Sequence, residues 1–156
     1  MTGRQWVLLS YRLPREPSTP RITVWRQLER LGAARLGDGL VGLPADARTR
    51  EQFDWLAAEI RQADGTATVW LGAPATREEE DAIIDGLRTA RAAEYDAIID
   101  KAATAAGAAG DERTRALRRL REDLRKVVRR DFFSPPQRDQ AHAAVEALVE
   151  PAARTR

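Results

Sequence analysis

The sequence contains no cysteine and only one histidine, His142. The absence of cysteine excludes disulfides, thiolate metal sites and cysteine nucleophiles. A single histidine without thiols or ordered carboxylates around it does not make a metal site, so we expect His142 to be a surface or packing residue. We therefore expect neither a metal nor a cofactor.

The chain also lacks a long hydrophobic run. No apolar stretch approaches the roughly 20 residues that a membrane-spanning helix needs, and the residues after Arg4 do not have the pattern of a signal peptide. We expect a cytoplasmic protein that does not enter a membrane.

No catalytic constellation is visible in the sequence. Ser10 has no recognisable histidine and aspartate partners, and Gly37, Gly39 and Gly42 fit a hairpin better than a phosphate-binding loop. Without a combination of acid, base and nucleophile, we do not expect an enzyme.

The first third of the chain predicts a strand, a loop and a helix. Residues 6–11 form an apolar and aromatic run of strand length, and residues 12–19 contain prolines and charges typical of a loop. Thr19 is predicted to cap a helix with Pro20 at its first position. Gly32 is predicted to end that helix in the left-handed conformation.

The following residues predict a hairpin, a second helix and a fourth strand. Residues 33–36 and 40–43 flank an Asp-Gly sequence that favours a tight turn. Thr49 and Gln52 have the spacing of a capping box at the start of a helix. Residues 66–71 alternate between apolar and polar or aromatic side chains, as a half-buried strand does.

The order βαββαβ predicts an α+β chain whose residues 1–74 form a ferredoxin-like domain. Both helices would cover one face of the sheet and leave the other face open. Trp70 is expected on the open face, and Trp55 lies off the apolar stripe of its helix. Exposed tryptophans of this kind suggest an interface, with the rest of the chain or with a second copy in a homodimer.

Residues 75–156 contain no strand signal and predict about three helices. Thr76 and Glu79 form a capping box before the first helix, which should reach about residue 106. Residues 111–131 carry leucines at heptad spacing, which predicts an antiparallel pair with the first helix. Ser134 is predicted to cap a last helix that Pro151 ends.

The second of these helices is strongly basic. Residues 111–130 contain nine basic and four acidic side chains, a net charge of nine minus four, or +5. Arg121, Arg125 and Arg129 recur every four residues without an acid between them on the same stripe, which costs helix stability unless an anion neutralises them. Phosphates of nucleic acid would do so, and binding would weaken with salt. The candidate nucleic-acid-binding residues are Arg118, Arg121, Arg125, Lys126, Arg129 and Arg130.

A solvated arginine face is the alternative interpretation. Ordinary i,i+4 pairs, such as Arg118 with Glu122 and Arg119 with Asp123, would account for part of the charge. The acidic helix within residues 78–100 would account for more by pairing with the arginines.

The first strand and loop carry a resemblance to a known family. The segments that carry it are Trp6-Val7-Leu8-Leu9-Ser10-Tyr11, Leu13-Pro14-Arg15-Glu16-Pro17-Ser18, Pro20-Arg21, Val24-Trp25-Arg26, Leu31-Gly32-Ala33, Leu43-Pro44, Thr49-Arg50-Glu51-Gln52-Phe53-Asp54-Trp55-Leu56 and Arg130-Asp131-Phe132-Phe133. On these segments the chain resembles the N-terminal domain of the chromate-resistance regulator ChrB, from about Trp6 to Phe133. The resemblance implies a bacterial cytoplasmic protein tied to chromate-inducible expression of an efflux gene.

The same strand–helix–hairpin pattern is similar to the ferredoxin-like domains of phenylacetate-type repressors and of CRISPR-associated spacer-acquisition nucleases. Those nucleases place an acid at the end of the first strand to hold a metal. Here that place is occupied by Ser10, Tyr11 and Arg12, so we do not expect nuclease chemistry.

Four arginines near the first loop form a second candidate site, for an oxyanion. Chromate is a sulfate-like dianion, and the N-terminus of the first helix favours anions. The candidate residues are Arg12, Arg15, Arg21 and Arg26. Salt bridges to Glu16 and Glu29 are the simpler explanation for the same arginines.

Two hypotheses follow from these patterns. The first is a non-enzymatic regulatory module that binds DNA through the Arg121, Arg125 and Arg129 stripe, with a dimer built on the sheet as one form of it. The second is a protein–protein interaction module without nucleic-acid binding, which would use Trp55 and the open sheet face.

Overall fold

The structure is a computed structural model that describes residues 4–149. The chain forms two compact units, Met1–Gly86 and Leu87–Arg156. The domain boundary expected after Pro74 stays a prediction, and the expected helix end at Pro151 lies outside the described residues.

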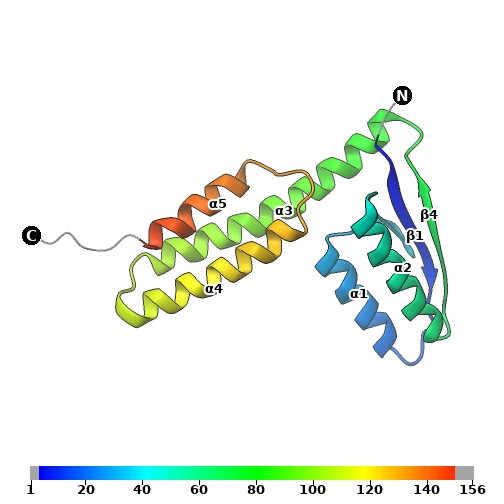
Figure 1. Cartoon of the computed structure of the whole chain (residues 1–156), viewed down its shortest axis with the longest axis horizontal. Helices are drawn as coiled ribbons and strands as arrows, with labels where there is room; N and C mark the ends of the chain where they lie inside the picture. The colour runs from blue at the N-terminus through cyan, green and yellow to red at the C-terminus, as the bar shows by residue number, and fades with distance from the viewer. Residues whose placement is uncertain (1–3, 150–156) are drawn as a thin grey trace, which may run out of the picture. The chain divides into compact units, whose positions relative to one another are not determined.

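The first unit is an α+β fold with the ferredoxin-like order βαββαβ, which confirms the expected fold class (Figure 1). Its four strands form one antiparallel sheet in the order β2-β3-β1-β4. The strands are β1 (Trp6–Arg12), β2 (Ala34–Gly37), β3 (Leu40–Pro44) and β4 (Thr66–Gly72). The helices are α1 (Thr19–Leu31) and α2 (Ala47–Gln62).

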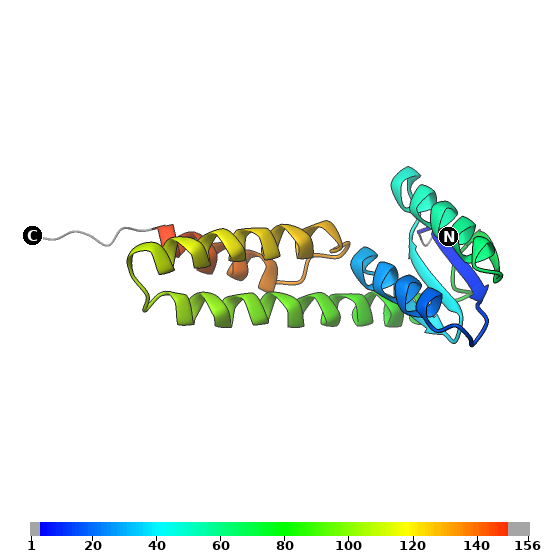
Figure 2. The ribbon, with the colours of Figure 1, turned by 90° about the horizontal axis from the view of Figure 1, so that it is seen from below.

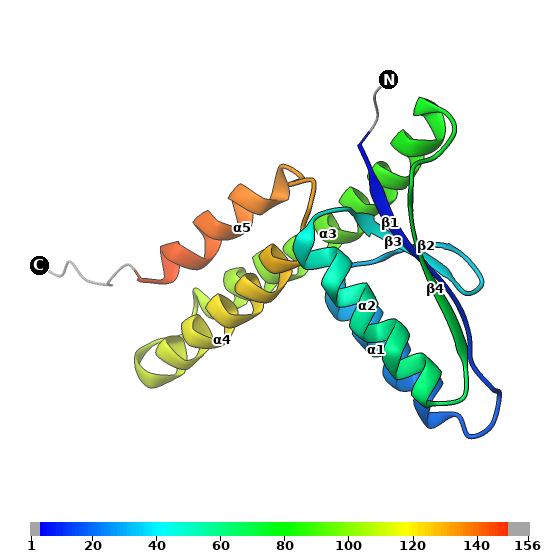
Figure 3. The same ribbon diagram turned by 45° about the vertical axis from the view of Figure 1, so that its right-hand side comes forward.

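Helices α1 and α2 lie side by side on one face of the sheet, as two views show (Figures 1 and 3). The core between the helices and the sheet is fully buried and apolar. Its members are Val7 and Leu9 of β1, Val41 and Leu43 of β3, Val24 and Leu28 of α1, and Phe53, Leu56, Ala57 and Ile60 of α2. Hydrophobic burial on this scale is the main term that stabilises such a fold.

One end of the opposite face of the sheet is covered within this unit. Trp6 is buried there, and its indole Nε1 donates a hydrogen bond of 2.8 Å to Glu80 Oε2. Glu80 belongs to the first turns of α3 (Arg77–Ala105). Further along the same face Trp70 is 52% exposed, so the expectation of an open face holds for that part of the sheet.

The helix ends test the predicted caps. Gly32 has a φ of 73° and closes α1 in the left-handed conformation, as expected. The Thr76–Glu79 capping box before α3 is also formed, with both reciprocal hydrogen bonds. Thr19, by contrast, is the first residue of α1, and Ser18 occupies the cap position without a side-chain bond.

The predicted cap of α2 is wrong by three residues. Asp46 is the cap residue, and its carboxylate accepts a hydrogen bond of 2.7 Å from the Thr49 amide. The Thr49 hydroxyl accepts from the Asp46 amide at 3.0 Å and donates to the Pro44 carbonyl at 2.7 Å. Because Thr49 completes the box from the third helical position, the helix starts one turn earlier than the Thr49–Gln52 spacing suggested.

The second unit contains the remainder of α3 with α4 (Gly110–Arg129), α5 (Gln137–Glu146) and the short 3₁₀ helix η1 (Ala147–Val149). Helix α4 runs back alongside α3, and α5 packs with them (Figure 2). The predicted cap of α5 is wrong, because Ser134 has a φ of 33° and Pro136 holds the cap position. The Ser134 hydroxyl instead accepts a hydrogen bond of 3.0 Å from Arg138 Nη1.

Candidate functional site

Helix α4 places its apolar side chains on one side only. Ala116, Leu120, Leu124 and Val127 are buried and pack against Tyr95, Ile98 and Ala102 of α3 and Ala141 and Val145 of α5. The 3.6-residue period then directs the remaining positions of α4 outward. The basic residues occupy most of that outer surface.

The outward face of α4 carries an exposed row of cations. Arg118, Arg121, Arg125 and Arg129 follow one another at intervals of three or four residues and are all exposed, as is Lys126. For Arg118, Arg125, Lys126 and Arg129, no carboxylate of residues 4–149 lies within 4 Å. We call Arg118, Arg121, Arg125 and Arg129 the α4 arginine row. Glu122 shares this face and is exposed.

Arg121 is the member of the row with a carboxylate partner. Its Nε and Nη2 atoms donate to the two oxygens of Glu146 on α5, at 3.2 and 3.1 Å. The hydrogen bonds from Arg121 lower the pKa of the Glu146 carboxyl below its ordinary value. Both side chains are largely exposed, so the pair remains accessible to solvent and to competing anions.

Arg130 is placed differently from the row. It is only partly exposed, and its Nη2 lies 2.6 Å from Glu94 Oε2. Arg91, a buried residue of α3, lies with its Nε 2.7 Å from Glu94 Oε1 and donates from Nη1 to the Arg130 carbonyl at 3.3 Å. The contact between Arg91 Nε and Glu94 has the distance of an ion pair without the angle of a hydrogen bond. The structure thus uses Arg130 to hold α4 to α3.

The expected i,i+4 pairs on α4 are wrong. Among residues 4–149, Arg118 makes no ion pair with Glu122, Arg119 none with Asp123, and Glu122 none with Lys126. Exposed pairs of this kind gain only about 0.3–0.5 kcal/mol, which is comparable to the cost of ordering two long side chains. The alternative interpretation, pairing with the acidic helix, holds for Arg130 with Glu94.

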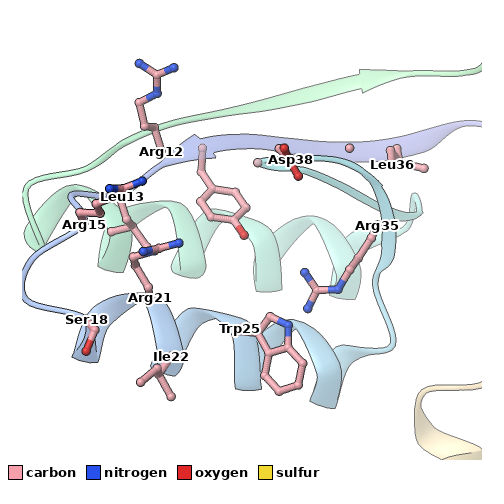
Figure 4. Close-up of a pocket in the computed structure, with 13 residues that line it drawn as sticks. Arg12, Leu13, Arg15, Ser18, Arg21, Ile22, Trp25, Arg35, Leu36 and Asp38 are labelled. Carbon is pink, nitrogen blue, oxygen red and sulfur yellow. The ribbon is translucent and has the colours of Figure 1, made fainter.

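The oxyanion candidates lie around an open pocket of about 1030 Å³ in the first unit. Arg12, Arg15 and Arg21 line this pocket, whereas Arg26 does not. Figure 4 shows the side chain of Arg12 pointing away from those of Arg15 and Arg21. No carboxylate of the described residues lies within 4 Å of these arginines, so the expected salt bridges to Glu16 and Glu29 are wrong.

Two residues that line this pocket were not predicted from the sequence. Arg35 of β2 lies with its Cζ 5.3 Å from the centre of the Trp25 ring, a cation–π distance, and pairs with Glu29 at 3.3 Å. Trp25 is 50% exposed and was not among the candidate site residues. The hairpin brings Arg35 to this site, and no local pattern at Arg35 signals it.

The interface candidates Trp55 and Trp70 are both exposed. Trp55 on α2 is 68% exposed, and Trp70 on β4 is 52% exposed. The Trp70 indole Nε1 donates a hydrogen bond of 2.9 Å to the Ser10 hydroxyl, which fixes the ring against β1. An exposed aromatic that is already held in place loses little freedom on meeting a partner.

The described residues offer no metal-binding group of three or more histidine, cysteine, aspartate or glutamate side chains. Within the same residues no helix has both the length and the hydropathy required to cross a membrane. His142 is exposed on α5.

Comparison with known proteins gives a consistent result. A family model described as "Protein ChrB, N-terminal" matches residues 21–154. Protein ChrB of Cupriavidus metallidurans is 36% identical over 78 residues, which cover 49% of this chain and 24% of the relative's length. No solved structure matches significantly. The family match covers most of the chain, including most of α1, the sheet hairpin and the α4 arginine row. The chain therefore belongs to the ChrB N-terminal family.

Proposed function

We propose that this chain is a non-enzymatic regulatory module of a chromate-resistance system, and that it binds DNA through the α4 arginine row to control a chromate-efflux gene. Family membership supports the regulatory role, and such a module would act in the bacterial cytoplasm. The observation that carries DNA binding is the row itself. Its members stand exposed on a helix whose other side is fixed in a core.

The geometry suits contacts to phosphates rather than to bases. The row extends from Arg118 to Arg129, a separation of 11 residue steps that each rise about 1.5 Å along α4. Guanidinium groups on that length reach several successive phosphates of one DNA strand, whose charges recur about every 3.4 Å along the duplex axis. Phosphate contacts position a protein on DNA without reading its sequence. The operator must therefore be specified elsewhere or through DNA shape.

The decisive experiment is salt-titrated binding to DNA from upstream of a chromate-transporter gene. The triple variant Arg118→Gln, Arg125→Gln, Arg129→Gln should bind more weakly and should reduce the magnitude of the log–log salt slope by up to about 0.9 per lost contact. The matched control is Arg26→Gln, Arg30→Gln, Arg88→Gln, which removes the same charge from exposed positions outside α4.

Wild-type binding that does not change with salt would contradict the proposal. So would equal losses in the α4 triple variant and in the control, because net charge alone would then explain the effect.

A small-molecule partner is a further part of the proposal. Chromate or a similar oxyanion would bind at the loop arginines, where Arg12, Arg15 and Arg21 line one pocket. Arg26 is exposed outside that pocket, which makes Arg26→Gln a natural control for anion binding.

The second candidate function is a protein–protein interaction or dimerisation module without nucleic-acid binding. The exposure of Trp55 and Trp70 favours it, and a homodimer through the sheet face is its simplest form. Sedimentation should then show a dimer that Trp70→Ser weakens, with DNA binding absent in both wild type and variant.

A further inference from the structure

The pocket beside α1 is larger and less uniform than an inorganic oxyanion requires. At about 1030 Å³ it lies at the upper end of the ~300–1,000 Å³ typical of organic-ligand sites. A bare tetrahedral anion would occupy only a small part of it. The pocket is formed by the end of β1, the following loop, α1 and the β2–β3 hairpin, all within the first unit.

The two ends of the pocket differ in chemistry (Figure 4). Arg15, Arg21 and Ser18 lie at one end, where α1 begins. Neither arginine has a carboxylate of residues 4–149 within 4 Å. The Ser18 side chain makes no capping bond, so the amides of Thr19 and Arg21 keep their donors available, whereas Pro20 between them has no N–H. Guanidinium groups beside free amides match a phosphate dianion.

The other end is aromatic and carries the only carboxylate among the described residues that line the pocket. Trp25, Arg35 and Asp38 lie there (Figure 4). Glu29 and the Trp25 ring hold Arg35 in place. The half-exposed Trp25 offers a planar apolar surface on which a ring can stack. Asp38, on the hairpin turn, can accept hydrogen bonds from hydroxyl or amino groups.

From this arrangement we propose that the pocket binds a nucleoside phosphate, with the phosphate at Arg15 and Arg21, the base against Trp25, and ribose or amino donors toward Asp38. A phosphate ester presents the same dianionic oxygens as an inorganic oxyanion, and the aromatic end adds the contacts that an inorganic ion lacks. The proposal does not depend on DNA binding by α4, since every residue involved belongs to the first unit.

Calorimetric titration of the whole chain with AMP, GMP, CMP and UMP, each compared with inorganic phosphate and with the free nucleoside, tests the proposal. At least one nucleotide should bind at least about tenfold more tightly than phosphate and than its nucleoside, because only the nucleotide uses both ends. The double variant Arg15→Gln, Arg21→Gln should weaken that binding by about tenfold or more. The control Arg26→Gln, Arg30→Gln makes the same charge change on α1 outside the pocket.

Trp25→Leu separates the two ends of the site. It should remove the preference for nucleotide over phosphate and leave phosphate binding unchanged, and far-UV circular dichroism verifies that the fold is retained. The proposal is overturned if phosphate binds as tightly as every nucleotide, if the control pair weakens binding as much as the Arg15 and Arg21 pair, or if no nucleotide binds.

Discussion

The Tyr95 hydroxyl donates a hydrogen bond of 2.7 Å to Asp131 Oδ2 and thereby joins the middle of α3 to the residue that follows the cap of α4. The other oxygen of Asp131 accepts from the backbone amides of Phe133 and Ser134, at 3.2 and 2.9 Å. One carboxylate therefore holds the connection between α4 and α5 against α3. Tyr95 itself is fully buried.

Tyr95→Phe should destabilise the helical unit. The change removes a hydrogen bond to a charged acceptor, worth about 1.5–3 kcal/mol, and keeps the ring in the core. The free energy of unfolding from urea titrations measures the loss. Tyr11→Phe is the control, because the Tyr11 hydroxyl makes no hydrogen bond to a described residue, and a loss as large as that of Tyr95→Phe would contradict this prediction.

Alkaline pH should weaken the same contact. Burial, and then the hydrogen bond to Asp131, raises the pKa of Tyr95 well above its ordinary value of about 10. A group whose pKa is raised in the folded state contributes full stability below its unfolded pKa, and this contribution declines as pH rises toward the folded pKa. The free energy of unfolding should therefore fall above about pH 10, by up to about 1.4 kcal/mol per pH unit from this site.

Comparing wild type with Tyr95→Phe isolates the contribution of Tyr95 to the pH dependence of the free energy of unfolding. Lysines and other groups that titrate in the same range affect both proteins equally. Unfolding at about pH 9 and about pH 11 suffices, since the ordinary tyrosine pKa lies between these values. A stability difference between the two proteins that is the same at both pH values would contradict the expected linkage.

The two N-caps of the first unit should respond differently to alanine. Asp46→Ala removes both the side-chain acceptor of the Thr49 amide and half of a capping box, which should cost about 1–2 kcal/mol. Ser18→Ala removes a side chain that makes no capping bond, so the loss should be a few tenths of a kcal/mol at most. Thermal or urea unfolding compares the two variants directly, and equal losses would contradict the assigned caps.

The fold was largely predictable because its signals are local. Alternation in residues 66–71, the Gly32 stop and the apolar stripe from Phe53 to Ile60 each follow from a short stretch of sequence. The N-cap of α2 was not predictable in this way. Asp46 and Thr49 have capping-box spacing, and so do Thr49 and Gln52 one turn later. Pattern alone does not choose between two overlapping boxes, whereas the buried bond from Thr49 to Pro44 does.

The candidate sites were predictable only where one element supplies the whole site. The α4 arginine row is such a case, since a single helical period places its members. Arg130 was grouped with the row, and only the packing of α3 against α4 reveals its pairing with Glu94. Arg35 reaches Trp25 through the hairpin, a tertiary contact that no spacing rule contains.

Glu94→Gln should destabilise the helical unit more than the same change at Glu146. Neutralising Glu94 leaves Arg91 and Arg130 together in a largely desolvated site, which should cost about 1–3 kcal/mol, less than for a fully buried pair because the side chains are 11–32% exposed. Glu146→Gln changes an exposed pair and should leave the urea midpoint within experimental error. Equal shifts of the midpoint would show that Arg91 and Arg130 do not depend on Glu94.

Glu146→Gln should strengthen DNA binding if the α4 arginine row meets phosphates. Glu146 holds two of the three donor nitrogens of Arg121, and its carboxylate lies beside the row. A glutamine at this position carries no charge that attracts Arg121, so the Arg121 guanidinium becomes available to a DNA phosphate. That phosphate also no longer meets the negative charge of the Glu146 carboxylate. The magnitude of the log–log salt slope should rise by up to about 0.9, the value for one additional phosphate contact. Glu51→Gln, an exposed change of equal charge on α2, is the control. An unchanged affinity and slope for Glu146→Gln would place the phosphates away from Arg121, and an equal gain for Glu51→Gln would reduce the effect to net charge.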